Sequence, residues 1–127
     1  MRRNQRLTKQ SDFTTVYRRG RAFAHPLVAL RLLSNQLPYS RYGFAVGKTV
    51  GKAVVRNQVK RRLREGVRTL SVESGWDIVM IARARAADAD FHALRRATAR
   101  LLSRAGVLTP VLPGEQAGPA DLETTEE

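Results

Sequence analysis

The chain has 127 residues, of which 43% are hydrophobic, and this is enough for one domain with a buried core. Its 23 lysines and arginines outnumber 11 aspartates and glutamates, and the net charge of +12 favours a polyanionic partner. The absence of cysteine excludes disulfides, thiolate metal sites and a thiol nucleophile, and agrees with a cytoplasmic location. No apolar run approaches the roughly 20 residues of a membrane span, so we predict a soluble protein without a membrane partner.

The charge is distributed unevenly along the chain. Residues 1–110 hold all 23 basic side chains and six acidic ones, a balance of +17. Residues 111–127 hold five acidic side chains and no basic one, and are rich in Pro, Gly, Thr and Glu. We therefore predict a single globular domain over 1–110 and a disordered acidic tail over 111–127. The tail is either a plain linker or a competitor that screens the basic body from non-specific RNA.

The first predicted element is a short helix over residues 11–19. Ser11 suits its beginning, because a short hydroxyl can accept a free backbone N–H of the first turn. Phe13 and Tyr17 lie four positions apart and give the helix an aromatic edge. Gly20 suits its end.

Three strand-like runs follow in the next part of the chain. Residues 27–33 and 41–46 flank a turn-forming segment that contains Pro38, and we predict that they pair as an antiparallel hairpin with a long loop. Residues 76–82 are too apolar for an exposed edge and predict a buried strand. The pattern does not decide whether this strand joins its neighbours in parallel or antiparallel.

Two longer helices complete the pattern. The stronger covers residues 54–70, where an apolar stripe repeats at intervals of three or four residues: Val55, Val59, Leu63, Val67 and Leu70. The last helix follows Asp90, which can cap it, and ends at Gly106 and Pro110. The order αββαβα predicts an α+β fold, a two-layer α/β sandwich in which helices pack on one small sheet.

The helix over 54–70 also carries a basic arc beside its apolar stripe. At 100° per residue, an arc of about 100° contains Asn57, Lys60, Arg61, Arg64 and Arg68, and Lys52 and Arg56 extend it toward the N-terminus. Glu65 falls on the other side of the helix. Because no acidic side chain offsets the repulsion along the arc, the pattern favours a phosphate-binding face over an ordinary exposed one.

The loop before this helix, Gly47-Lys-Thr-Val-Gly51-Lys52, places two lysines at a helix N-terminus, where free N–H groups favour anions. It resembles a nucleotide-binding loop. Its glycine spacing from Gly43 is one residue too short, so we exclude an NTPase and predict an anion-binding turn that includes Lys48.

Two other residue types are candidates for a site. Phe13 and Tyr17 could stack on the bases of single-stranded RNA, although their spacing alone favours core packing. His25 and His92 are the only histidines, and neither lies near an acid at a metal-ligand spacing. We therefore predict neither a catalytic constellation nor a metal site in the protein.

One run is specific to a known family. The segment Ala53-Val-Val-Arg-Asn-Gln-Val-Lys-Arg-Arg-Leu-Arg-Glu65 closely resembles the signature of the protein subunit of bacterial ribonuclease P. The segments Phe13-x3-Tyr17-Arg-Arg-Gly20, Gly43-Phe-Ala-Val-Gly47-Lys48 and Asp77-Ile-Val-Met-Ile-Ala-Arg83 resemble that family too. The resemblance covers about residues 3–105.

The resemblance implies the small basic partner of a catalytic RNA that removes the 5′ leader of precursor tRNA. The chain would then be the protein subunit of an endoribonuclease (EC 3.1.26.5) whose chemistry, with Mg²⁺, resides in the RNA, and no cofactor would be bound by the protein alone. It also implies a left-handed βαβ crossover, where pattern alone expects a right-handed one.

The resemblance assigns two sets of residues. The catalytic RNA would be bound by Lys48, Lys52, Arg56, Asn57, Lys60, Arg61, Arg64 and Arg68. The leader would bind in a cleft between the first helix and the sheet, at Phe13, Tyr17 and Arg31, and Arg31 stands where some relatives have an aromatic residue. Two alternatives are a ribosomal-type structural RNA-binding protein and a self-sufficient nuclease; the scattered acidic residues disfavour the nuclease.

Overall fold

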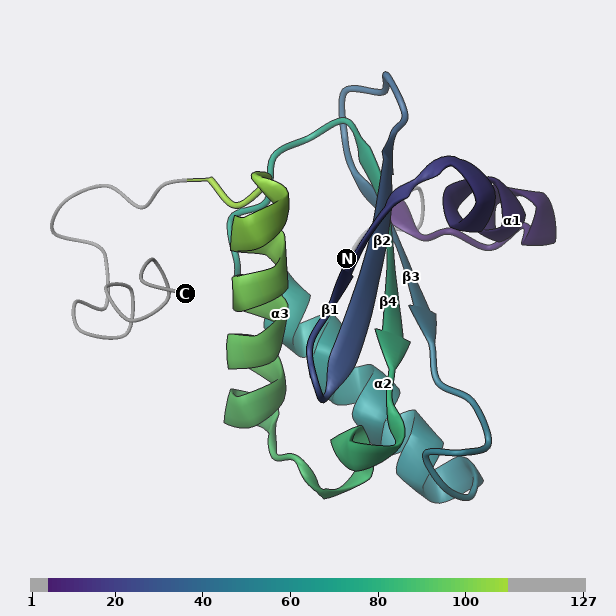
Figure 1. The fold of residues 1–127 in the computed structure, drawn as a ribbon, viewed down its shortest axis with the longest axis vertical. Helices are drawn as coiled ribbons and strands as arrows, with labels where there is room; N and C mark the ends of the chain where they lie inside the picture. The colour runs from purple at the N-terminus through teal and green to yellow at the C-terminus, as the bar shows by residue number, and fades with distance from the viewer. Residues whose placement is uncertain (1–4, 110–127) are drawn as a thin grey trace, which may run out of the picture.

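The computed structural model describes residues 5–109, so Pro110 and the acidic tail over 111–127 lie outside the described residues. The elements are α1 (Gln10–Arg19), β1 (Arg21–Ala24), β2 (Val28–Ser34), β3 (Arg41–Ala45), α2 (Ala53–Arg68), β4 (Trp76–Ala82), the 3₁₀ helix η2 (Ala84–Asp88) and α3 (Phe91–Ala105). Helices pack on a four-stranded sheet (Figure 1), which confirms the α+β class.

The strands are ordered β1-β2-β4-β3 in the sheet. The predicted hairpin of β2 with β3 is wrong, because β4 lies between them and pairs with β2 from Val28↔Ala82 to Ser34↔Trp76. β4 is antiparallel to β2 and parallel to β3. As the most apolar strand, β4 gains most from the central position, where it is buried on both faces.

The strand β1 was missed from the sequence, and it is the true hairpin partner of β2. It pairs antiparallel with β2 from Arg21↔Leu32 to Ala24↔Ala29. The turn is closed by the N–H of His25, which donates to the carbonyl of Val28 over 2.9 Å. Only four residues long and mostly exposed at the sheet edge, β1 has too little apolar alternation to be recognised.

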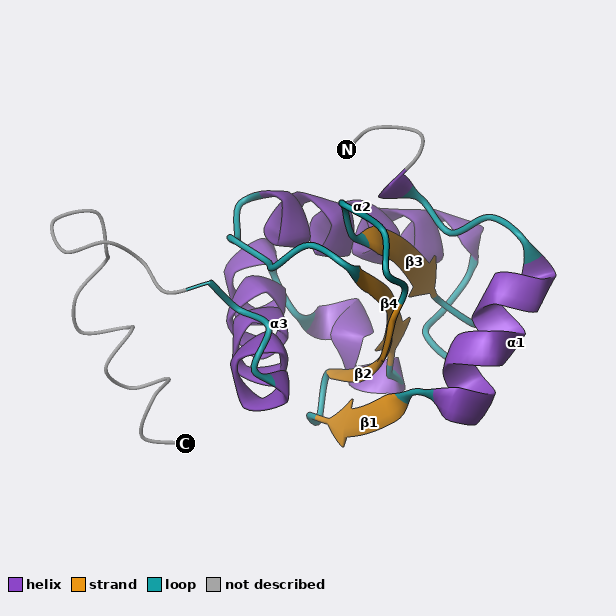
Figure 2. Cartoon of the chain, turned by 90° about the horizontal axis from the view of Figure 1, so that it is seen from above, coloured by secondary structure: helices purple, strands orange, loops and turns teal. Residues whose placement is uncertain are grey.

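The connection β3-α2-β4 joins two parallel neighbouring strands. In Figure 1 the strands β3 and β4 both point down. If the molecule is turned so that they point up and the face covered by α2 is toward the viewer, β4 lies to the left of β3 (Figures 1 and 2). The crossover is therefore left-handed, as the family resemblance implied and against the usual preference.

Helices cover the two faces of the sheet unequally (Figure 2). The helices α2 and α3 pack on the face that carries Leu30, Leu32, Ile78 and Met80, and all four side chains are fully buried. On the other face α1 covers a much smaller cluster, whose buried members are Leu7, Val16 and Val79.

The helix ends agree only in part with the sequence predictions. Asp90 caps α3 as predicted, accepting the Ala93 N–H over 2.8 Å, and Gly106 ends it with φ of +81°. Ser11 does not cap α1, which begins one residue earlier, after Lys9, without a side-chain cap. Gly20 ends α1 in extended backbone, where a Cβ would lie 2.5 Å from the Val16 carbonyl oxygen.

Candidate nucleic-acid interface

The basic arc of α2 lies at the molecular surface. Val59, Leu63 and Val67 point into the core, which fixes the rotation of the helix. Of the predicted RNA-binding residues, five are exposed and three are half-buried. The exposed ones are Lys48, Lys52, Asn57, Arg61 and Arg68, and the half-buried ones are Arg56, Lys60 and Arg64.

One member of the arc has an acidic partner that the sequence analysis placed on the other side of the helix. The guanidinium of Arg68 donates to the carboxylate of Glu65 over 2.6 Å. Residues three apart are neighbours on a helix surface, and this spacing was the missed signal. The hydrogen bond lowers the pKa of the Glu65 carboxyl. Arg68 is therefore partly neutralised already.

The beginning of α2 has unsatisfied donors. Lys52 occupies the N-cap position and makes no side-chain cap, so the backbone N–H groups of the first turn keep their positive dipole end uncovered. Within the described residues, the buried Nε of Arg56 has no hydrogen-bond partner. The uncapped N–H groups of the first turn, unlike the buried Nε, lie at exposed residues and are donors that an anion can reach.

The turn before α2 holds its lysines on a fixed backbone. The N–H of Val50 donates to the carbonyl of Gly47, and that of Gly51 to the carbonyl of Lys48, over 3.1 and 3.2 Å. Gly51 has φ of +151°, which side chains rarely adopt. Lys48 and Lys52 therefore stand at the two ends of one closed turn.

The three predicted cleft residues come together around α1. A row across the sheet contains Arg31, Val79 and Gly43. The ring of Phe13 lies over Gly43, where a Cβ would be 2.6 Å from its Cε1 and Cζ atoms. The guanidinium of Arg31 lies 5.5 Å from the ring centre of Tyr17 and donates to the Tyr17 carbonyl over 2.7 Å.

The two rings differ in their exposure. Phe13 is half-buried and packs against the small cluster under α1. Tyr17 is 37% exposed, an unusual value for a large aromatic side chain. Core packing therefore describes Phe13 well, whereas Tyr17 presents its ring at the surface with a cation beside it.

Next to α1 the sheet carries two alanines on either side of an isoleucine. The row beyond Arg31 and Val79 contains Ala29, Ile81 and Ala45, all half-buried. Sequence reasoning missed this strip, although side chains alternate between the two faces of a strand and this alternation could have indicated it.

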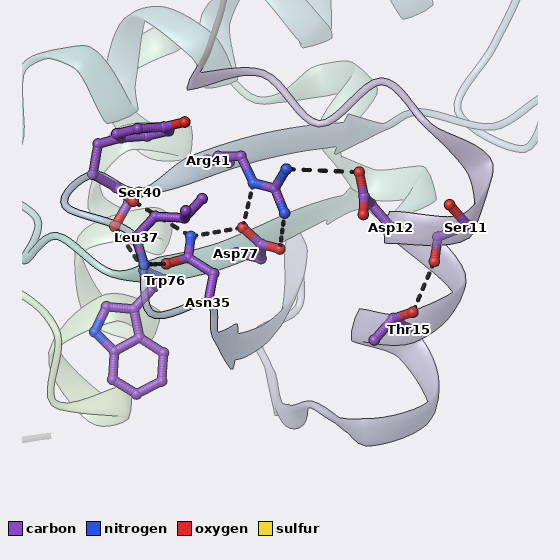
Figure 3. Close-up of polar contacts among 10 residues, drawn as sticks. Ser11, Asp12, Thr15, Asn35, Leu37, Ser40, Arg41, Trp76 and Asp77 are labelled. Atoms are coloured by element: carbon purple, nitrogen blue, oxygen red, sulfur yellow. Dashed lines mark hydrogen bonds and ion pairs between the residues drawn. The ribbon is translucent and has the colours of Figure 1, made fainter.

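A polar cluster fixes α1 on this face (Figure 3). Arg41 donates from Nε and Nη2 to the two carboxylate oxygens of Asp77 over 2.8 and 2.6 Å, and Asn35 donates to the same carboxylate over 2.8 Å. The Nη1 atom of Arg41 lies 3.7 Å from a carboxylate oxygen of Asp12, in the first turn of α1. The bond to Asp77 raises the pKa of Arg41. The cluster therefore ties the helix that carries the rings to the sheet.

Within residues 5–109, no group of three or more His, Cys, Asp or Glu side chains is arranged to hold a metal ion. None of the helices in the same residues is long and apolar enough to cross a membrane.

Comparisons with known proteins agree on one family. The Ribonuclease P family model matches residues 1–106. The ribonuclease P protein component of Dehalococcoides mccartyi (strain CBDB1) is 44% identical over 109 residues, which is 86% of this chain and 91% of that protein. That of Symbiobacterium thermophilum is 44% identical over 85% of this chain and 96% of its own length.

Solved structures of the same family share the fold. The RNase P protein of Staphylococcus aureus superposes with a TM-score of 0.75 at 30% identity, covering 83% of this chain and 98% of that one. The RNase P protein from Thermotoga maritima superposes with a TM-score of 0.72 at 31% identity, covering 78% of this chain and 96% of that one.

Proposed function

This chain belongs to the ribonuclease P protein family, and we propose that it binds the catalytic RNA and the 5′ leader of precursor tRNA and so promotes removal of the leader. As the protein component it is part of a holoenzyme that is an endoribonuclease (EC 3.1.26.5). The observation that carries the proposal is the presence of two different surfaces. One is the basic arc of α2 with its open N-terminus, and the other is the aromatic face of α1 beside the sheet.

The catalytic RNA is assigned to the arc and the turn before it. The residues are Lys48, Lys52, Arg56, Asn57, Lys60, Arg61, Arg64 and Arg68. RNA phosphates offer the acceptors that the first turn of α2 lacks. Arg68 contributes least, because Glu65 already offsets its charge.

The leader is assigned to the face formed by Phe13, Tyr17 and Arg31. A single-stranded leader has unstacked bases, which bind to aromatic rings and guanidinium planes. Tyr17 is the principal platform because its ring is exposed, while Phe13 packs on Gly43 and presents only part of its ring. The small side chains of Ala29 and Ala45 let a base approach the sheet.

In this proposal the Mg²⁺ ions of the hydrolysis are held by the catalytic RNA. The protein binds and orients the RNA. Its described residues supply hydrogen-bond donors for phosphates and stacking surfaces for bases. The cytoplasmic location expected from the sequence stays a prediction.

A reconstituted assay at low Mg²⁺ concentration tests the function. Purified protein is added to catalytic RNA and precursor tRNA, and we expect faster leader removal than with the RNA alone. No increase would contradict the proposal. Cleavage without the RNA would favour a self-sufficient nuclease, and RNA binding without any increase would favour a structural RNA-binding protein.

The salt dependence of binding tests the assignment to α2. Lys60→Ala and Arg64→Ala each remove a phosphate-binding group, and each should reduce the slope of log affinity against log salt concentration by about 0.7–0.9. Gln58→Ala is the matched control, because Gln58 is an exposed uncharged residue of the same helix. An unchanged slope in both the lysine and the arginine variant would make the arc an ordinary solvent-exposed face.

A further inference from the structure

The helix α3 carries a second row of basic side chains that the proposed function does not use. Arg96, Arg100 and Arg104 follow one another at intervals of four residues, and α3 contains no acidic residue between Phe91 and Ala105. Positions four apart stand about 6 Å apart along a helix axis, and like charges there repel. We call these three residues the α3 arginine row.

The α3 arginine row lies on the side of the helix away from α2. The neighbouring Arg95 faces α2, since its Nε donates to the Thr69 hydroxyl over 2.7 Å. A period of 3.6 residues places Arg104 on the opposite side of α3 from Arg95. Arg104 accordingly reaches β1, where its guanidinium donates to the carbonyl of Ala24 over 3.1 Å. The row and the arc of α2 are separate surfaces.

The edge strand β1 adds a fourth arginine to the row. The guanidinium groups of Arg21 and Arg104 lie 5.1 and 5.9 Å from the ring centre of Phe23. Arg21 also donates to the carbonyl of Ala105, over 3.4 Å. A guanidinium has five N–H donors, so one bond to a carbonyl positions the group and leaves donors for a ligand.

The ion pairs of the described residues involve arginines elsewhere in the molecule, Arg41 and Arg68. Among residues 5–109, neither Arg21, Arg96 nor Arg104 forms an ion pair. His25, in the turn after β1, has a pKa lowered by burial and then by Arg100 and Arg104. The carboxyl of Asp90 at the beginning of α3 has a pKa lowered chiefly by the N–H of Ala93 and also by Arg96. Asp90 is thus an N-cap, and the edge keeps an excess of positive charge.

We propose that the β1–α3 edge, formed by Arg21, His25 and the α3 arginine row, is a second RNA-binding surface. It binds phosphates of an RNA segment other than the one on α2, because β1 lies at the sheet edge opposite to β3, against which α2 packs (Figure 2). The inference rests on the proposed function. The shared ligand chemistry is RNA phosphate, from either the catalytic RNA or the tRNA.

Crosslinking in the holoenzyme identifies the RNA. The chain has no cysteine, so Ser103→Cys, beside Arg100 and Arg104 in the sequence, gives a unique attachment point for a photocrosslinker. The matched control is Ser74→Cys, an exposed serine before β4. With catalytic RNA and precursor tRNA both present, we expect position 103 to crosslink to one of them more strongly than position 74. No RNA product at position 103, or a product with a second protein copy only, overturns the proposal.

Salt dependence measures the contribution of the arginines. Two binding reactions are measured: protein to the catalytic RNA, and precursor tRNA to the holoenzyme. In one of them, the double variant Arg96→Gln/Arg104→Gln should reduce the slope of log affinity against log salt concentration by about 0.7–0.9 for each phosphate contact that is lost. Arg18→Gln, at an exposed arginine of α1 across the sheet, should leave the slope for the catalytic RNA unchanged, because α1 is assigned to the leader. If the double variant does not fold, Arg96→Gln alone serves, because Arg96 makes no hydrogen bond within residues 5–109.

The two proposals fail in different ways. Unchanged slopes for a folded variant, together with normal stimulation of cleavage by the wild-type protein, overturn the second surface only. Absence of stimulation by the wild-type protein overturns the proposed function itself.

Discussion

The two faces of the sheet are built from alternate residues of the same strands, yet they differ in composition and in burial. On the face under α2 and α3, the side chains of Leu30 and Met80 are completely buried. On the face under α1, Ala29, Arg31 and Ile81 remain half-buried beside the aromatic side chains of one short helix. The face under α2 and α3 therefore contributes more buried apolar surface to stability. The other face carries the small, polar and partly exposed residues to which we assign the leader.

The sharpest test of this difference is a truncation on the face under α2. Leu63 is 1% exposed, and Leu63→Ala should lower the free energy of unfolding by about 2–5 kcal/mol, since it removes buried methyl groups and leaves a cavity. Val54→Ala is the control on the same helix, because Val54 is 80% exposed. Urea unfolding measures both. A loss for Leu63→Ala no greater than for Val54→Ala would contradict the assignment of the core.

On the α1 face we expect stability to depend on a polar contact. Asp77→Ala leaves Arg41 without the carboxylate that it binds with two hydrogen bonds, and should destabilise the protein by about 3 kcal/mol. Asp88→Ala, at an exposed aspartate of η2, should change stability by no more than about 0.5 kcal/mol. Thermal and urea unfolding measure the pair. Equal effects would mean that the Asp77 carboxylate does not stabilise the α1 face.

The binding role that we propose for the α1 face is tested at Tyr17. Tyr17→Ala should weaken holoenzyme binding of precursor tRNA by about 1–3 kcal/mol, the usual contribution of base stacking, and affect mature tRNA much less because only the precursor has a leader. Phe13→Ala should show the same preference together with a loss of stability. Tyr17→Phe keeps the ring and should bind nearly normally. An equal loss for both tRNAs would make the ring purely structural.

The smallest expected effect concerns the contact of Phe13 with the backbone. Gly43→Ala places a Cβ 2.6 Å from the ring, so the ring must move, at a cost of about 1 kcal/mol. Gly47→Ala is the control, because a Cβ there meets nothing within 4 Å. The melting temperature and precursor affinity of the two variants should differ. If they do not, the ring is not held against Gly43.

Features that depend on nearby residues were predictable from the sequence. The apolar stripe of α2, the Asp90 cap and the bounds of β4 all follow from local spacing, and the structure confirms them. Pairing between distant segments was not predictable. The Arg41–Asp77 contact joins residues 36 positions apart, and the hairpin prediction assumed that consecutive strands are neighbours. Strand β1 has strand geometry mainly because β2 pairs with it.

The predicted site residues were found by two different routes. The basic arc of α2 follows from helical periodicity, although the Glu65–Arg68 ion pair was overlooked. Phe13, Tyr17 and Arg31 were grouped through the family resemblance. Their proximity depends on how α1 crosses the sheet, which no local pattern encodes. Whether these residues bind RNA stays a prediction.

The insertion of β4 between β2 and β3 has a consequence for synthesis on the ribosome. Before Trp76 leaves the exit tunnel, the chain can form the β1–β2 hairpin, but β3 has no strand partner. The residues of the basic helix α2 have then already emerged, while β4, the strand that completes the sheet beneath α2, has not. A nascent chain that has emerged from the tunnel only as far as residue 75 therefore exposes the arginines of α2 before it has the fold that orients them. The time between the two events is set by translation.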